Sequence, residues 1–292
     1  MGNGRAYAWA IGLAMPHFAS YDGTEIGYHV RGDGPPLVCL PGGPARATDY
    51  LGDLGGLDRS RQLILMDSRG AGLSADPADP ATFSADRLVF DVEAFRVHLG
   101  LDQMDLLAHS AGAVLATLYA AAHPEHLSRL ILITPGLAAV GIEVSQEQFR
   151  AALERLAAEP WYPAALAALE KITAGDLSIE AFRASRPLFY GRWDDAALAH
   201  ATVGVAERHQ AAREGFFAAA IDPAATRTAL NKLTAPVLLY AGDGDPLVTP
   251  AMVAQAAPLF NDATVTVQQG AAHYPWVDGP AAFAAAISSF LG

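Results

Sequence analysis

The sequence predicts an α/β fold with a mostly parallel sheet of eight strands, helices on both faces and an inserted helical cap. Short apolar runs recur at 37–40, 63–66, 104–108 and 130–134, and longer segments with helical spacing separate several of them. Uninterrupted apolar runs of this length are typical of parallel strands that are buried on both faces and joined by crossover helices. The composition agrees with a large core, because 52% of the 292 residues are hydrophobic and 17% are charged.

The two ends of the chain complete this sheet. Residues 18–30 predict two short antiparallel strands joined at Asp22-Gly23, a dipeptide that supplies the backbone conformation of a tight hairpin turn. Further segments have the length and spacing of helices and buried strands. The expected helices are 83–99, 111–122 and 280–291, and the expected strands are 237–240 and 264–267.

The region 136–231 shows no clear strand and is rich in alanine, so it predicts a helical cap. Tyr190 and Trp193 belong to a group of aromatic residues in this region and are candidate substrate contacts beneath the cap. The alternative is ordinary packing in a core, which is common for large rings. The predicted division is an N-terminal extension at 1–17, an α/β core at 18–135 and 232–292, and a cap at 136–231.

The charge and the N-terminus limit the expected partners. Thirty-one acidic and nineteen basic side chains give a formal net charge of −12, which repels phosphate backbones and anionic membrane surfaces. We therefore expect neither nucleic acid nor a membrane as a partner, and the sequence indicates no oligomeric state. Arg5 and the apolar stretch 6–15 only weakly resemble a secretory signal, and a disordered extension or a start at Met15 explains them as well. The expected location is cytoplasmic.

Ser110 lies where an apolar strand runs into a helix-forming segment. The residues two positions away are Ala108 and Gly112, and a serine on a sharp, strained strand-to-helix turn requires small neighbours of this kind. Such a turn exposes the hydroxyl as a nucleophile and aims backbone N–H groups, Ala111 N–H among them, at developing negative charge. The alternative is a serine that only caps the helix. The neighbouring His109 is expected to face away and to be structural.

Two loops near the C-terminus carry candidates for the base and the acid that would activate this serine. His273 follows the strand expected at 264–267 through a glycine-rich approach, and it is the expected base. Asp245 follows the strand expected at 237–240, and it is the expected acid that orients the histidine. Asp243 is the alternative acid, but its position nearer the strand end favours a role in the turn.

The sequence predicts no metal site and no cofactor. His123 and His126 resemble a metal-binding pair, but Pro124 between them breaks the helical spacing that would bring two ring nitrogens together. A glycine-containing stretch at 67–74 follows the strand expected at 63–66, but it lacks the lysine and the third glycine of nucleotide-binding loops. We treat this stretch as scaffold.

The Pro-Gly-Gly-Pro stretch at 41–44, the 67–74 loop, the serine turn and the loops with the acid and the histidine together resemble an α/β-hydrolase from about Phe18 onward. The serine, the acid and the histidine follow one another in the order that this fold uses. In this family a loop at the position of 41–44 supplies the second oxyanion donor. The resemblance therefore implies Gly43 N–H for that role, with Gly42 as the second choice.

Within the family, the chain is similar to proline iminopeptidases and their esterase-like relatives. Pro41, Ala45 and Ser68 depart from the iminopeptidase pattern, which usually has histidine, glycine and glutamine there. An aminopeptidase also needs carboxylates to pair with the substrate ammonium, and Glu207 and Glu214 are the candidates in the cap. A solvated helix face is the stronger explanation of these two glutamates.

The resemblance implies a serine hydrolase that cleaves an ester or amide bond of a small-molecule substrate through an acyl-enzyme at Ser110. A proline iminopeptidase-like aminopeptidase that releases an N-terminal residue is one alternative. A non-catalytic small-molecule receptor on the same fold is an alternative of another class. The sequence does not identify the substrate, because the residues that would contact it lie in a cap whose register the sequence does not specify.

Overall fold

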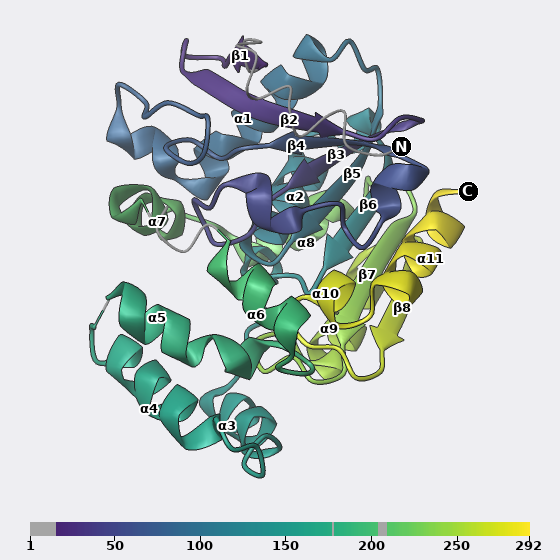
Figure 1. The fold of residues 1–292 in the computed structure, drawn as a ribbon. Coiled ribbons are helices and arrows are strands. Elements are labelled where there is room, and N and C mark those ends of the chain that lie inside the picture. The colour runs from purple at the N-terminus through teal and green to yellow at the C-terminus, as the bar shows by residue number, and fades with distance from the viewer. Residues whose placement is uncertain (1–15, 177, 204–208) are drawn as a thin grey trace, which may run out of the picture.

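The computed structural model describes residues 16–176, 178–203 and 209–292, and its centre is an eight-stranded sheet with the order β1-β2-β4-β3-β5-β6-β7-β8 (Figure 1). The first two strands pair antiparallel, β2 also runs antiparallel to β4, and all other neighbours are parallel. This confirms the predicted mostly parallel eight-stranded α/β sheet. The strands are β1 (His17–Ala19), β2 (Glu25–Arg31), β3 (Pro36–Leu40), β4 (Gln62–Met66), β5 (Met104–His109), β6 (Leu127–Ile133), β7 (Val237–Gly242) and β8 (Ala263–Gln268).

The hairpin at the start of the sheet forms at the predicted dipeptide. Asp22 Oδ1 accepts a hydrogen bond from Thr24 N–H at 3.1 Å, and Gly23 has a φ of 84°, which side-chain-bearing residues rarely adopt. The register that follows pairs Phe18 with Ile26.

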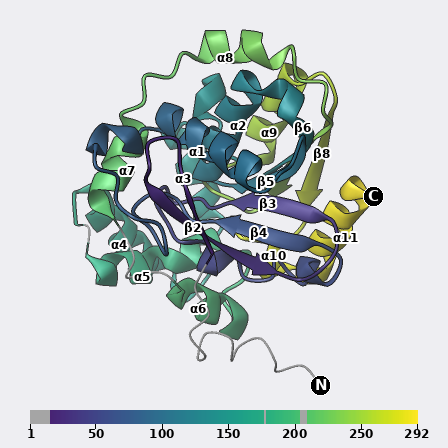
Figure 2. The same cartoon turned by 90° about the horizontal axis from the view of Figure 1, so that it is seen from above.

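The central strands bury both faces, which explains their uninterrupted apolar sequences. In β5, the side chains of Leu106 and Ala108 belong to one core cluster, and that of Leu107 belongs to the cluster on the other face. Helices α1, α2 and α9 cover the first face, and α10 and α11 lie on the second (Figure 2). These helices are α1 (Ala85–His98), α2 (Ala111–Ala122), α9 (Pro250–Ala256), α10 (Pro275–Asp278) and α11 (Pro280–Leu291).

Between β6 and β7 the described residues form helices and no strand. Helices α3 to α6 gather at one end of the sheet, beyond the carboxyl ends of the parallel strands (Figure 1). Leu153, Ala165 and Leu188 form a separate small core among them. The helices of this region are α3 (Gln146–Glu154), α4 (Tyr162–Thr173), α5 (Ile179–Ser185), α6 (Asp195–Thr202), α7 (Gln210–Phe217) and α8 (Pro223–Leu230), and the 3₁₀ turn η7 (Arg186–Phe189) follows α5.

The last helix of this region packs on the sheet domain. Leu230 of α8 is buried in the main core cluster, and the Arg227 side chain donates a hydrogen bond from Nε to Val140 O at 2.8 Å. The division of the chain into a core and a cap at 136–231 remains a proposal, and this packing favours ending the cap before α8. Among the residues described, no helix combines the length and apolar character needed to cross a bilayer.

Candidate active site

Ser110 occupies a strained turn between β5 and α2. Its φ of 53° and ψ of −122° place a residue with a side chain in a region that is costly for L-amino acids. The neighbouring backbone is very close, because a Cβ added to Gly112 would lie 2.4 Å from Pro41 O. On the other side, Ala108 is fully buried. The small residues around Ser110 are therefore required by the packing of this turn against the end of β3.

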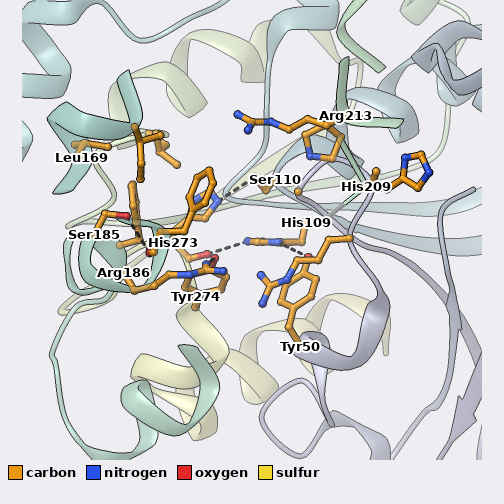
Figure 3. Close-up of a pocket in the computed structure, with 18 of the residues that line it drawn as sticks. Tyr50, His109, Ser110, Leu169, Ser185, Arg186, His209, Arg213, His273 and Tyr274 are labelled. Atoms are coloured by element: carbon orange, nitrogen blue, oxygen red, sulfur yellow. Dashed lines mark hydrogen bonds between the residues drawn. The ribbon is translucent and has the colours of Figure 1, made fainter. Parts of the chain in front are cut away.

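The structure brings Ser110, Asp245 and His273 together in one hydrogen-bonded line, of which Figure 3 shows the part between Ser110 and His273. His273 Nε2 lies 2.9 Å from Ser110 Oγ, and His273 Nδ1 lies 2.7 Å from Asp245 Oδ2. The other carboxylate oxygen, Oδ1, accepts a hydrogen bond from Leu247 N–H at 2.8 Å. Because Asp245 is fully buried and His273 is 5% exposed, water does not compete strongly for these bonds. The arrangement can move a proton from the serine hydroxyl to the imidazole.

The alternative acid lies elsewhere. Asp243 Oδ1 accepts a hydrogen bond from Gly270 N–H at 2.8 Å, which ties the loop after β7 to the loop after β8. The carboxylate bonded to His273 is that of Asp245.

The surroundings of the two central histidines shift their pKa values in opposite directions. Burial by itself lowers the pKa of His273, but the Asp245 carboxylate outweighs burial and raises this pKa above its ordinary value. Burial and the neighbouring His273 hold the pKa of His109 well below its ordinary value, so the ring of His109 is neutral. Its Nε2 faces His273 O at 2.9 Å and must carry the proton, since a carbonyl oxygen can only accept. His109 Nδ1 therefore accepts a hydrogen bond from the Tyr50 hydroxyl at 2.8 Å.

The glycine loop after β3 contacts the serine turn directly. A Cβ on Gly42 would lie 2.8 Å from the Ser110 Cβ, so only glycine allows this approach. Gly42 N–H already donates a hydrogen bond to Tyr50 Oη at 2.6 Å, which makes it a poor oxyanion donor. Within the described residues, Gly43 N–H and Ala111 N–H have no hydrogen-bond partner. Gly43 and Ser110 both line one cavity.

A cavity of about 360 Å³ opens above Ser110. Its described lining includes three arginines, Arg46, Arg186 and Arg213, and no aspartate or glutamate. Figure 3 shows Arg186 and Arg213 on different sides of the Ser110–His273 pair. The apolar part of the lining includes Leu169, Ile172, Phe182, Phe189, Leu247 and the ring of Tyr274.

The cap residues predicted to contact substrate lie elsewhere. Tyr190 is 2% exposed, stacks on Tyr274 and places its hydroxyl 2.8 Å from the His200 ring, and it does not line the cavity. Trp193 packs against the core cluster that contains Tyr190, and it does not line the cavity. The carboxylate of Glu214 is exposed and accepts a hydrogen bond from Gln210 at 2.8 Å, and Glu214 is also absent from the lining. Glu207 lies outside the described residues.

Sequence reasoning missed the basic character of the cavity. Arg46 follows the glycine loop at 41–44 closely, and Tyr274 directly follows His273, so adjacency to these motifs was an available signal. Arg186 and Arg213 come from cap helices and turns whose orientation no local pattern reveals.

The expectation that proline keeps His123 and His126 apart is wrong. The segment Pro124–His126 forms a 3₁₀ turn in which residues three apart eclipse, and the two imidazole rings stack with centroids 5.6 Å apart. Together with Glu93 they offer three ligand atoms within 4.8 Å of one another. The Glu93 carboxylate already pairs with Arg96 at 2.6 Å, which leaves it poorly suited to a cation. The absence of a metal requirement remains a prediction.

A family model described as the alpha/beta hydrolase fold matches residues 35–280. The chain belongs to this family. The α/β hydrolase fold accounts for the sheet order, the serine turn after β5 and the acid and histidine loops after β7 and β8. This membership confirms the family resemblance that the sequence motifs indicated.

Curated relatives share one part of this α/β hydrolase. A proline iminopeptidase of Heyndrickxia coagulans is 34% identical over 118 residues, which are 40% of this chain and 41% of the relative. A proline iminopeptidase of Lactobacillus helveticus is 38% identical over 117 residues, which are 38% of this chain and 40% of the relative. The matched part of this chain thus spans about 40% of the length of these relatives.

Solved structures resemble the α/β hydrolase over nearly its full length. An esterase from Exiguobacterium antarcticum superposes with a TM-score of 0.73 at 19% identity, covering 95% of this chain and 99% of that chain. The esterase RhEst1 from Rhodococcus superposes with a TM-score of 0.70 at 23% identity, covering 96% and 98%. At these identities the likeness shows the fold.

Proposed function

We propose that this α/β hydrolase is a serine hydrolase that cleaves an ester or amide bond of a small-molecule substrate through an acyl-enzyme. The observation that carries the proposal is the continuous line from Ser110 Oγ through His273 to the buried Asp245 carboxylate. These three groups provide a nucleophile, a base and the group that orients the base.

In the first half of the reaction, Ser110 Oγ attacks the substrate carbonyl carbon while His273 Nε2 accepts the hydroxyl proton. The carbonyl oxygen becomes an oxyanion, which accepts hydrogen bonds from Gly43 N–H and Ala111 N–H at the start of α2. The bond to the leaving group then breaks, and His273 gives its proton to the departing alcohol or amine. The product of this half is an ester between Ser110 and the acyl group.

In the second half, water attacks the acyl-enzyme carbonyl carbon while His273 Nε2 takes a proton from the water. The tetrahedral intermediate collapses, the acid is released, and the proton returns to Ser110 Oγ. Asp245 stabilises the imidazolium that forms in both halves, because its carboxylate lies 2.7 Å from Nδ1. This role agrees with the raised pKa of His273, in which Asp245 outweighs the opposing effect of burial.

A second candidate is an aminopeptidase that releases an N-terminal residue, because the curated relatives that match this chain are named proline iminopeptidase. Such an enzyme must bind a substrate ammonium. Among the described residues that line the cavity there is no carboxylate, and there are three arginines. These charges favour the esterase or amidase over the aminopeptidase.

The test compares wild type with Ser110→Ala using a fluorophosphonate probe and two sets of substrates. We expect covalent labelling of wild type at Ser110, hydrolysis of short-chain 4-nitrophenyl esters, and loss of both in Ser110→Ala. Faster cleavage of aminoacyl naphthylamides than of the esters would favour the aminopeptidase. A folded wild-type protein that neither takes up the probe nor hydrolyses any substrate would overturn the proposal and favour the non-catalytic receptor.

A further inference from the structure

The cavity is cationic in a chain whose formal net charge is −12. Arg46, Arg186 and Arg213 line it, and its described lining holds no carboxylate to balance them. A buried arginine outside the cavity can have such partners. Arg69, for example, is 1% exposed and pairs with Asp91 at 2.6 Å and with Asp22 at 2.5 Å. The described lining thus gathers three guanidinium groups with no carboxylate among them, an arrangement that suits an anionic ligand.

Arg186 is a buried cation with a free donor. It is 8% exposed, and its Nη1 donates a hydrogen bond to Tyr274 Oη at 3.0 Å. Its Nε is buried and has no hydrogen-bond partner among the described residues. A buried guanidinium without a counter-charge costs free energy, because it has lost water without gaining an anion.

Arg46 is half-buried and also has a guanidinium nitrogen without a partner in the residues that the structure describes. It follows the glycine loop after β3, and its Nη2 donates a hydrogen bond to Val203 O at 2.9 Å. Its Cζ lies 3.7 Å from the centre of the Tyr50 ring, which orients the planar guanidinium. Its Nε is also buried and has no hydrogen-bond partner in the described part of the chain.

The two guanidinium groups act on the same end of the cavity. Burial by itself raises the pKa of Tyr274, but Arg186 and Arg46 outweigh burial and lower this pKa to about 8. The hydroxyl of Tyr274 thus lies in a strongly positive field, and the Tyr274 ring packs edge-on against the His273 ring. This field favours any negatively charged group that enters the same space.

We propose that the substrate carries a carboxylate, and that Arg186 and Arg46 bind it beside Tyr274 while Ser110 attacks the ester or amide carbonyl. This inference rests on the proposed serine hydrolase. A planar carboxylate suits the two guanidinium groups that line the cavity, since arginine presents its N–H donors in a fixed fork. The preferred substrates are therefore anionic esters or amides, such as half-esters of short dicarboxylic acids. Substrates with a free ammonium are repelled by the same arginines.

The test uses two matched pairs of esters, because the carboxylate can belong to either side of the cleaved bond. In the first pair, mono-4-nitrophenyl glutarate carries the charge on the acyl side, and its methyl ester is neutral. In the second pair, the butyrate ester of 4-hydroxybenzoate carries the charge on the leaving group, and the butyrate ester of methyl 4-hydroxybenzoate is neutral. Ser110→Ala supplies the background rate for each ester.

We expect kcat/KM for the anionic member of one pair to exceed that of its neutral partner by about 10- to 100-fold, as a charge-assisted hydrogen bond implies. Arg186→Gln should reduce this preference to about one, mainly by raising KM for the anion. Arg186→Lys should retain part of it. Arg183→Gln is the matched control, because Arg183 is an exposed arginine of α5 that does not line the cavity, and the preference should persist in this variant.

Binding to the inactive protein provides a readout that does not depend on catalysis. Calorimetry should detect glutarate binding to Ser110→Ala and at least about tenfold weaker binding to the double variant Ser110→Ala with Arg186→Gln. The inference is overturned if wild type hydrolyses the neutral members at least as fast as the anionic members of both pairs. It is also overturned if Arg183→Gln removes the preference as fully as Arg186→Gln. If wild type hydrolyses no ester and takes up no probe, the proposed function fails, and glutarate binding still decides the anion site.

Discussion

Replacing Asp245 with asparagine is the sharpest test of the proposed chemistry, because the surroundings determine which way the new amide points. Asp245 Oδ1 accepts a hydrogen bond from Leu247 N–H at 2.8 Å, so the asparagine must place its oxygen there. Its NH₂ group then faces His273 Nδ1 across the former 2.7 Å contact. An NH₂ group can only donate, so Nδ1 becomes an acceptor and the proton moves to Nε2. His273 Nε2 then points its own proton at Ser110 Oγ and cannot accept one.

The size of the loss follows from these contacts. Restoring the reactive tautomer would set two N–H donors against each other in a fully buried position, and each unsatisfied buried donor costs about 1–3 kcal/mol. The imidazolium that forms during attack also loses a charge-assisted hydrogen bond worth about 1.5–3 kcal/mol. The two contributions sum to about 3.5–9 kcal/mol, and a penalty of about 5.5 kcal/mol within this range corresponds to a fall in kcat of about 10⁴-fold.

The assay is steady-state hydrolysis of 4-nitrophenyl butyrate, with the concentration of folded protein checked by circular dichroism. Asp243→Asn is the matched control, because asparagine keeps an oxygen that can accept the Gly270 N–H bond, and its kcat should stay close to that of wild type. If Asp245→Asn retained more than about a tenth of the wild-type kcat, the tautomer argument would be refuted. The same conclusion would follow if the control variant lost as much activity.

Three further predictions test the surroundings of the site. Because Asp245 outweighs burial and raises the pKa of His273 above 6.5, the neutral imidazole that acts as the base is lost as pH falls through the raised pKa, and kcat/KM should decline there. A pH profile of kcat/KM that stays flat down to pH 6.5 and below would contradict this. Gly112→Ala should lower the free energy of unfolding in urea by about 1–3 kcal/mol, since its Cβ would lie 2.4 Å from Pro41 O. An unchanged urea midpoint would show that the loop moves away without cost. Tyr50→Phe should destabilise the protein by about 1–3 kcal/mol in thermal unfolding, because Gly42 N–H and His109 Nδ1 both lose their buried hydrogen-bond partner. A variant as stable as wild type would show that these two groups find other partners.

The sheet and the serine turn could be predicted from the sequence because their signals are local. A run such as 104–108 is apolar at every position, and this pattern by itself indicates a strand buried on both faces. Ser110 is recognisable because a strained turn excludes bulky neighbours, and those neighbours are adjacent in the chain. The positions of Asp245 and His273 after two late strands predicted their convergence, since the carboxyl ends of parallel strands meet at one edge of the sheet.

The sequence by itself determined the α/β class, the order of the strands along the chain and the choice of Ser110, His273 and Asp245 as the residues that meet. Only the tertiary structure decided that Arg46 and Arg186 line one cavity, that Tyr190 packs away from it, and that His123 and His126 stack. Backbone preference and apolar spacing act between residues close in sequence, so they leave a record in the sequence itself. The orientation of a cap side chain depends on which distant surface packs against its helix, and no local pattern records that surface.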